Sequence, residues 1–276
     1  MKYFINCKGN LVDLSTPKIM GILNVTPDSF YDGGRYTTEK DILKRVDKML
    51  NDGATFIDVG AYSTRPKAKN VSLEEELNRS IKAINAILKT FPETLISVDT
   101  FRSKVAQEAI NAGACMINDI SGGTLDSNMF QTVANLQVPY ILMHIQGTPE
   151  NMQENPHYTD VVCDIRAYFS DKINTLKNLG INDIILDVGF GFGKTIAHNY
   201  ELLNNLDLFN CFGLPLLAGI SRKSMLYKIL DIEAKNALNA TTVANTLALQ
   251  KGASILRVHD VKEAFEAVKI VNQLTA

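Results

Sequence analysis

The sequence of 276 residues has few residues that could cross-link the fold through disulfides or metal ions. It has only four cysteines, none of them in a C-x-x-C pair, and it also lacks tryptophan. Cysteines so far apart predict reduced thiols rather than a disulfide framework. The chain also lacks any stretch of the roughly 18 apolar residues that a membrane-spanning helix needs, and polar residues interrupt its N-terminus too early for a secretory signal. We therefore expect a soluble, cytoplasmic protein that does not bind membranes.

An excess of charge of either sign is absent as well. The chain has 28 basic and 30 acidic side chains, a net charge of −2. Proteins whose main partner is nucleic acid usually carry a strongly basic surface, so we expect no nucleic-acid partner. The four histidines show no spacing typical of zinc ligands, which argues against a zinc site.

What the sequence does contain is a regular alternation of short apolar runs and helical stretches. The apolar runs are rich in aliphatic and β-branched residues and predict buried parallel strands; they span residues 18–24, 55–59, 94–99, 114–118, 138–144, 183–187, 214–219 and 254–258. Helical spacing is clearest at 41–50, 72–90, 101–111, 158–179, 237–250 and 261–274. Eight strand–helix units favour an α/β fold, a single (β/α)8 TIM barrel, over the alternative of an open doubly wound sheet.

The two ends of the chain add little to this architecture. Residues 1–17 predict a short N-terminal hairpin or cap, with Lys8, Gly9 and Asn10 as its turn. A capping box, Ser72 followed by Glu75, predicts where the second helix begins. The sequence has no linker and no low-complexity tract, so we expect residues 1–276 to form one domain.

Polar residues end most of the predicted strands. In a (β/α)8 barrel these carboxyl ends meet at one mouth, where the chemistry of such enzymes takes place. A single aspartate after a strand is often only a turn former, whereas a full set predicts a site. The residues concerned are Asn24, Asp58, Asp99, Asn118, His144, Asp187, Arg257 and His259.

The last two strands offer groups that bind anions. Arg222 and Lys223 follow the seventh run, and the eighth run ends in Arg257 and His259, which face the same way in an extended strand. Loops after strands seven and eight of such barrels commonly bind phosphate. With Asn24 on the neighbouring first strand, these residues predict a diphosphate site that includes a hard metal ion.

The other part of the mouth is rich in hydrogen-bond acceptors. Asp99, Asn118 and Asp187 suit the edge of a planar heterocycle that carries an amino group and a ring N–H. Paired carboxylates could instead belong to a glycosidase or a two-metal site. The amide between them and the nearby Lys223 favour recognition of a ring.

Three loops between strand and helix stand out. Residues 24–35 and 60–67 mix glycine and proline with polar groups, which suits lids over a charged ligand. The glycine-rich segment 189–195 fails as a P-loop because Val188 stands where glycine is needed, and fails as a dinucleotide fingerprint because of Lys194. We expect its glycines to let the backbone approach a flat ligand, with Phe190 as a wall.

Seven short motifs in this chain resemble those of the dihydropteroate synthase family. They are NVTPDSF at 24–30, STRP at 63–66, SVDT at 97–100, LMHIQGTP at 142–149, GFGFGK at 189–194, SRKS at 221–224 and RVHDV at 257–261. They occur in the family's order and span almost the whole chain. The resemblance implies a dimeric (β/α)8 barrel, a target of sulfonamides, that condenses 6-hydroxymethyl-7,8-dihydropterin diphosphate with 4-aminobenzoate to give 7,8-dihydropteroate and diphosphate in folate biosynthesis.

The resemblance also implies roles for residues at matching positions. It places the pterin on Asp99, Asn118, Asp187 and Lys223, Mg²⁺ on Asn24, and the diphosphate on Arg257 and His259. It places the arylamine near Thr64, Arg65, Phe190 and Ser224, and puts Phe30 and Asp32 on the closing first loop. The residues implied as catalytic are Asn24, Asp32, Asp99, Lys223, Arg257 and His259.

Two alternatives to this function remain at the level of sequence. One is a pterin-binding methyltransferase, whose barrel resembles this one at the Asp–Asn–Asp edge but does not need Arg257 and His259. The other is a catalytically silent pterin-binding paralogue. Tyr31, Tyr62, Lys67 and Val188 also differ from the residues usual in the family, which bears on loop behaviour more than on the ligands.

Overall fold

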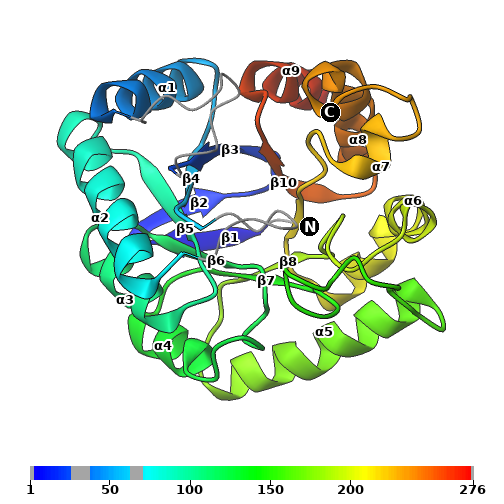
Figure 1. Ribbon diagram of the computed structural model, residues 1–276, viewed down its shortest axis with the longest axis horizontal. Helices are drawn as coiled ribbons and strands as arrows, with labels where there is room; N and C mark the ends of the chain where they lie inside the picture. Colours follow the sequence, from blue (N-terminus) through cyan, green and yellow to red (C-terminus); the bar gives the residue numbers. More distant parts are fainter. Residues whose placement is uncertain (1–2, 26–37, 63–70, 275–276) are drawn as a thin grey trace.

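Parallel strands closed into a barrel form the centre of the molecule. The computed structural model describes residues 3–25, 38–62 and 71–274. The barrel order is β10-β3-β4-β5-β6-β7-β8-β9, and Figure 1 shows the helices as a ring around it. The strands are β3 (Lys18–Asn24), β4 (Phe56–Gly60), β5 (Leu95–Asp99), β6 (Met116–Asp119), β7 (Tyr140–Met143), β8 (Ile184–Asp187), β9 (Leu216–Ala218) and β10 (Ala253–Val258). Each predicted strand is present, and the closed barrel is confirmed over the open sheet.

The helices agree with the predicted periodicity where that was strong. The predicted ones are α1 (Glu39–Asn51), α2 (Leu73–Thr90), α3 (Ser103–Asn111), α5 (Val161–Asn178), α8 (Leu238–Gln250) and α9 (Val261–Asn272). The structure adds α4 (Met129–Leu136), α6 (Ile196–Asn204) and α7 (Ser224–Tyr227), with 3₁₀ turns η1 (Leu206–Phe212) and η2 (Ala234–Asn236). None of the helices in the described residues is long and apolar enough to cross a membrane.

The start of α2 corrects one detail of the prediction. Ser72 is the N-cap, and its hydroxyl accepts a hydrogen bond from the backbone N–H of Glu75 at 3.1 Å. The Glu75 carboxylate, however, pairs with Arg79 one turn along the helix. Only half of the predicted capping box is therefore formed, because an ion pair takes the carboxylate that would have reached back to Ser72.

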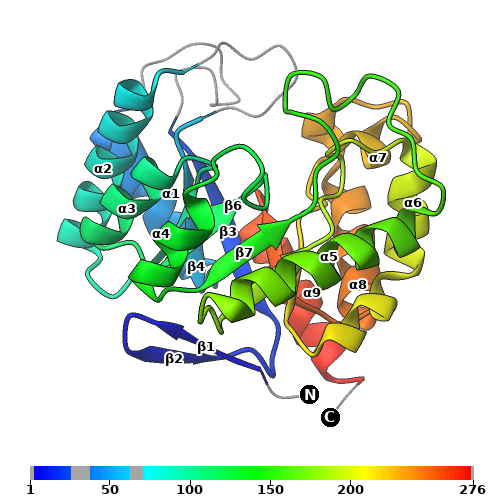
Figure 2. The same cartoon turned by 90° about the horizontal axis from the view of Figure 1, so that it is seen from below.

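An N-terminal hairpin closes the lower end of the barrel, as predicted (Figure 2). Strands β1 (Phe4–Cys7) and β2 (Asn10–Asp13) pair antiparallel, and the turn residues Lys8 and Gly9 have φ of 53° and 87°. Positive φ at both positions is what a two-residue type I′ hairpin turn requires. Ile5, Cys7 and Leu14 pack against the lower interior of the barrel and seal it.

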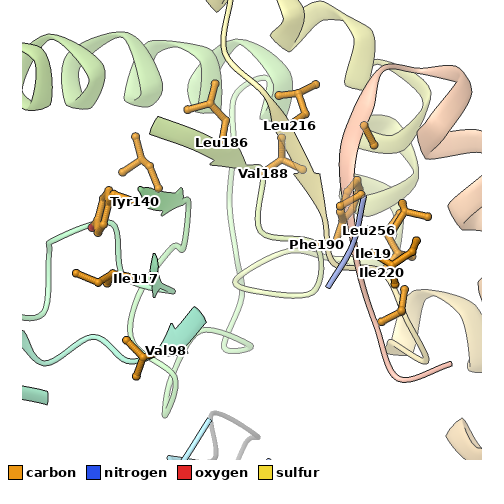
Figure 3. Close-up of a cluster of buried hydrophobic side chains, with 14 of the residues drawn as sticks. Ile19, Val98, Ile117, Tyr140, Leu186, Val188, Phe190, Leu216, Ile220 and Leu256 are labelled. Carbon is orange, nitrogen blue, oxygen red and sulfur yellow. The ribbon is translucent and has the colours of Figure 1, made fainter. Parts of the chain in front are cut away.

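The two faces of each strand explain both the core and the site. Residues facing outward, such as Val98, Ile117 and Tyr140 on three consecutive strands, pack in the layer between barrel and helices (Figure 3). Residues facing the axis begin with an apolar layer: Met20, Phe56, Met116, Ile141, Ile185, Leu217 and Ile255. Two residues further along a strand the side chain returns to the same face. The axis-facing successors at the upper end include Asp58, Asn118, Asp187 and Arg257.

Candidate active site

An arginine held by two carboxylates lies at the centre of the barrel mouth. Nε of Arg257 donates to Oδ2 of Asp58 at 2.6 Å, and its Nη2 donates to Oδ2 of Asp99 at 2.5 Å. These residues come from β10, β4 and β5, which closure of the barrel brings together. Burial acts to lower the pKa of Arg257, but Asp58 and Asp99 outweigh it, so the pKa lies above its usual value and the guanidinium stays charged.

Asn118 joins the same cluster from β6. Its Nδ2 donates to Oδ2 of Asp58 at 3.0 Å, and the side chains of both residues are buried. Asn118 is aligned with Asp99 in the register of β5 and β6. The structure therefore brings Asp99 and Asn118 together, as expected from the sequence, with Asp58 beneath them.

Asp187 and Lys223 continue this surface on the next strands. A Cβ built at Gly219 would lie 3.8 Å from both Oδ2 of Asp187 and Nζ of Lys223, so the two charged groups flank one glycine. The Lys223 ammonium also donates to the carbonyl of Phe190 and lies 4.7 Å from the centre of the Phe192 ring. An ammonium beside a carboxylate, at a ring face, suits a flat polar ligand.

The residues predicted to bind an anion lie at the end of β3, in the loop after β9, and at or directly after the end of β10. A Cβ at Gly60 would lie 3.2 Å from Oδ1 of Asn24 and 3.7 Å from Oδ2 of Asp99, so these two side chains meet over a glycine. On the other side, the hydroxyl of Ser221 lies 3.0 Å from Nδ1 of His259 and accepts from the His259 backbone N–H at 3.2 Å. Since Asn24 and Asp99 lie beside the same glycine, the predicted anion corner adjoins the predicted acceptor edge.

One basic residue expected in this corner points elsewhere. Arg222 makes a two-pronged ion pair with Asp260, Nε to Oδ2 and Nη2 to Oδ1 both at 2.8 Å, and also donates to the carbonyls of Ala234 and Lys235. Its backbone has φ of 54°, in the left-handed region. Arg222 thus connects the loop after β9 to the start of α9. The prediction that Arg222 contributes to a diphosphate site is wrong in this structure, because its side chain is paired with Asp260.

The glycine-rich segment after β8 also differs from expectation. Gly189 has φ of 70°, and a Cβ there would come within 2.0 Å of the His144 carbonyl oxygen. At Gly193 a Cβ would lie 2.5 Å from the carbonyl oxygen of Gln146. These two glycines let the segment approach the loop after β7. The Phe190 side chain is fully buried in the core, so Phe192, half-buried beside Lys223, is the aromatic wall.

The charges in the mouth shift one another's ionisation. Burial raises the pKa of Asp99 to about 7, opposed by the Arg257 guanidinium and aided by the Asp58 carboxylate. Burial lowers the pKa of Lys223 to about 8, although Asp187 favours its charged form. Burial and the Arg257 charge lower the pKa of His259 to about 3, so its imidazole is neutral near pH 7. Groups poised near neutrality in a cleft are typical of functional sites.

The remaining sequence predictions fall into two groups. Ser224, half-buried, is the first residue of α7, directly after Lys223. Asp32, Thr64 and Arg65 lie outside the described residues. The sequence placed Asp58 among the strand-end residues of the mouth but gave it no role, and it did not single out Phe192. The sequence does indicate that Asp58 faces the barrel axis, because it follows the axis-facing Phe56 by two positions at the end of a strand. Nothing in the sequence indicates which of Phe190 and Phe192 lies at the mouth.

Comparison with known proteins agrees with this geometry. Residues 20–259 match the protein family described as pterin binding enzyme. Dihydropteroate synthase of Escherichia coli (strain K12) is 46% identical over 273 residues, covering 98% of this chain and 95% of that protein. Dihydropteroate synthase of Haemophilus influenzae is 44% identical over 272 residues, covering 98% of each.

Solved structures give the same result. Yersinia pestis dihydropteroate synthase with a sulfonamide drug complex superimposes with a TM-score of 0.94 at 42% identity, covering 99% of both chains. Xanthomonas albilineans dihydropteroate synthase in complex with 7,8-dihydropteroate has a TM-score of 0.89 at 35% identity, again covering 99% of both.

A closed barrel with this polar mouth and this family match defines a class: the chain belongs to the pterin-binding enzymes. Within that family its relatives over nearly their full length are dihydropteroate synthases. The resemblance seen in the motifs is confirmed. The chain is a dihydropteroate synthase, a transferase of folate biosynthesis that joins 6-hydroxymethyl-7,8-dihydropterin diphosphate to 4-aminobenzoate.

Proposed function

We propose that the pterin ring binds edge-on to Asp99, Asn118 and Asp187, with Lys223 at its carbonyl side. The observation that carries this assignment is the continuity of the mouth. Asp58 links Asn118 to Arg257, Arg257 links to Asp99, and Asp187 with Lys223 flanks Gly219. Acceptors on one side and an ammonium on the other match a ring that offers N–H groups along one edge and an oxygen beside them.

The diphosphate would lie over Asn24 and His259, within reach of Arg257. Ser221 accepts a hydrogen bond from the His259 backbone N–H, which leaves its own O–H to donate to Nδ1 of the imidazole. The neutral ring then carries its proton on Nε2, where it can donate to a phosphate oxygen. Two carboxylates already bind Arg257, so Nη1, which has no hydrogen-bond partner among the described residues, rather than the whole guanidinium would contact the anion.

Mg²⁺ is the metal we assign, with Asn24 as its protein ligand. The side-chain oxygen of Asn24 is a hard donor at the mouth, and Gly60 leaves space beside it. No group of three or more His, Cys, Asp or Glu side chains in the described part of the chain could hold a metal ion. Mg²⁺ keeps several waters and binds through few protein oxygens plus substrate phosphates, so a single amide fits. The ion would neutralise charge that develops on the departing diphosphate.

The reaction is a substitution at the pterin methylene carbon. The C–O bond to diphosphate breaks, the arylamine nitrogen forms the new C–N bond, and one proton leaves that nitrogen. Asp99 and Asp187 place negative charge near the carbon while it carries positive charge, and His259 and Arg257 donate to the leaving oxygen. An arylamine is largely unprotonated at neutral pH, so attack needs no general base. We expect Thr64, Arg65 and Ser224 to bound the arylamine, with Phe192 rather than the buried Phe190 as its aromatic wall. Asp32 would act from the first loop.

Diphosphate release tests this function directly. The purified protein, mixed with both substrates and Mg²⁺, is expected to release diphosphate and form dihydropteroate at equal rates. Methyl transfer to an acceptor protein or thiol would indicate the methyltransferase alternative, and pterin binding without turnover would indicate the silent paralogue. An Arg257→Ala variant with near-normal turnover would refute the assignment of the leaving group.

We further propose that residues 1–276 act as one domain, as a homodimer in the cytoplasm. Support for the dimer comes from α8, where Val243 and Leu247, one helical turn apart, are 54% and 46% exposed. Aliphatic side chains spaced in this way favour a protein interface. All four cysteines are free thiols, as expected of a reducing compartment. Light scattering on wild type and a Val243→Glu, Leu247→Glu variant tests the dimer, and loss of mass by half is the expected result.

A further inference from the structure

A third carboxylate, Asp58, lies beneath the acceptor edge. Its side chain is fully buried, so it cannot touch a ligand that occupies the mouth. Oδ2 accepts hydrogen bonds from Nδ2 of Asn118 at 3.0 Å and from Nε of Arg257 at 2.6 Å. Both partners belong to the proposed site, and they come from strands on opposite sides of β4 in the barrel order.

The first of these contacts fixes how Asn118 presents its amide. An amide has a donor end and an acceptor end, and a rotation of 180° exchanges them. A carboxylate can only accept, so the neighbouring Asp58 must face the Nδ2 end of Asn118. The carbonyl oxygen Oδ1 is then the end offered to a ligand. With a neutral amide at position 58, both orientations of Asn118 would satisfy their partner.

The second contact fixes where Arg257 lies. Asp58 binds Nε, the nitrogen nearest the backbone, and Asp99 binds Nη2 at the tip of the guanidinium. If Asp58 lost its charge, Asp99 would be the remaining carboxylate bound to Arg257 among the described residues. The guanidinium would then compete more strongly for the same Asp99 oxygen that the pterin needs.

Both hydrogen bonds of the Asp58 carboxylate within the described ranges go to residues of the proposed site. Oδ1 is buried and has no hydrogen-bond partner within the described ranges. Asp119 on the next strand is the opposite case, since its buried carboxylate accepts from Tyr140, from Ser121 and from the backbone N–H of Gly123. Asp119 stabilises its own loop, whereas the hydrogen bonds of Asp58 go only to site residues.

We propose that Asp58 is a positioning residue of the transferase reaction, one that orients Asn118 as an acceptor and seats Arg257 without touching substrate. The inference rests on the pterin-edge role proposed above for Asn118 and Asp99. It predicts an effect on the pterin diphosphate and not on 4-aminobenzoate, because Asn118 belongs to the proposed pterin edge and Arg257 would contact the diphosphate of the same substrate.

Asp58→Asn is the test variant, since asparagine keeps the shape of the side chain and removes its charge. The expected result is at least a tenfold rise in KM for the pterin diphosphate, with KM for 4-aminobenzoate within twofold of wild type. Calorimetric binding of 6-hydroxymethylpterin, which lacks the diphosphate, should weaken by a similar factor. Asp119→Asn is the matched control: an equally buried carboxylate whose loss should lower the unfolding midpoint and leave both KM values unchanged.

The outcomes separate this inference from the proposed function. Wild type that fails to bind 6-hydroxymethylpterin refutes the proposed pterin edge itself. Wild type that binds it, with Asp58→Asn binding equally well, refutes the positioning role, as does an equal change in both KM values. A crystal structure of wild type with 6-hydroxymethylpterin provides a test that needs no variant. Asn118 should donate to Asp58 and accept from the ring, and a pterin in direct contact with Asp58 would overturn the inference.

Discussion

The ammonium of Lys194 lies 3.1 Å from Nδ1 of His144, and both side chains are buried behind the acceptor edge. Nζ also lies 3.3 Å from the His144 carbonyl oxygen and 2.9 Å from that of Phe192. Three acceptors match the three N–H bonds of an ammonium group. Lys194 therefore fastens the glycine-rich segment after β8 to the end of β7, close to Asp187.

Replacing Lys194 by methionine should destabilise the fold. The variant keeps the length of the side chain but leaves three buried acceptors without their donor, and an unsatisfied buried group costs about 1–3 kcal/mol. We expect the free energy of unfolding in urea to fall by about 2 kcal/mol or more. Lys104→Met is the control, because Lys104 is exposed and pairs with Glu108 on the surface of α3, where a loss under about 1 kcal/mol is expected. Equal losses in the two variants would contradict the role of Lys194.

The buried His144 should make stability depend on acid. Burial and the Lys194 charge lower the pKa of His144 to about 2, far below the value near 6.5 expected in the unfolded chain. Between these values the unfolded chain binds a proton that the folded chain does not, so stability falls as pH falls below about 6.5. From pH 7 to pH 5 this histidine alone should remove about 2 kcal/mol.

A His144→Gln variant isolates this effect. Glutamine still offers an acceptor to Lys194 but does not titrate, so the loss of unfolding free energy between pH 7 and pH 5 should shrink by about 2 kcal/mol. His157→Gln, which removes an exposed imidazole, should leave the pH dependence as it is in wild type. Parallel pH curves for wild type and His144→Gln would show that the folded state protonates His144 freely.

Much of the fold could be predicted because burial imposes a period on the sequence. The strand β3 was predicted to the residue, because a short apolar run at residues 19–23 lies between the polar residues Lys18 and Asn24. Short elements were not predicted, because they contain too few residues to show a period. Helix α4 has eight residues and its N-cap Asn128 makes no side-chain cap hydrogen bond, so neither periodicity nor a capping signal marks it.

The sequence predicts which residues reach the mouth of the barrel, but it does not predict how their side chains pair there. The end of a strand places Arg257 and Asp99 at the mouth, yet their contact joins residues 158 positions apart and depends on closure of the barrel. The error at Arg222 has the same origin. Its sequence neighbours Ser221 and Lys223 face the mouth, but a positive φ turns its side chain toward Asp260.

A buried ion pair beside the second loop should be critical for stability. Glu76 of α2 is fully buried, accepts from Thr100 at 2.6 Å and pairs with Arg102 at 2.7 Å. Arg102 also donates to the carbonyl of Val71 at 2.9 Å and lies over the ring of Tyr62. Arg102→Met would leave the Glu76 charge buried and unpaired, which typically costs about 3–5 kcal/mol.

Denaturant unfolding of two variants, each of which breaks an ion pair to a glutamate of α2, tests this cost. Arg79→Met breaks the more exposed pair with Glu75, and a loss of about 0.5 kcal/mol is expected. An Arg102→Met, Glu76→Gln double variant should recover part of the stability lost in Arg102→Met, because it removes the unpaired charge. A double variant no more stable than Arg102→Met would mean that packing on Tyr62, not charge, accounts for the loss.

The pH dependence of kcat/KM for the pterin diphosphate should be a narrow bell. Burial raises the pKa of Asp99 to about 7, and this carboxyl must lose its proton to accept from the ring, so the rate constant should rise through that pH. Burial lowers the pKa of Lys223 to about 8, and loss of its charge should reduce kcat/KM above that pH. Lys223→Arg keeps the charge at higher pH, so its descending limb should move upward by at least one pH unit while the ascending limb stays in place.

Binding of 6-hydroxymethylpterin, measured over the same pH range, excludes titration of the diphosphate as the cause. If the descending limb of Lys223→Arg coincides with that of wild type, Lys223 is not the group that titrates.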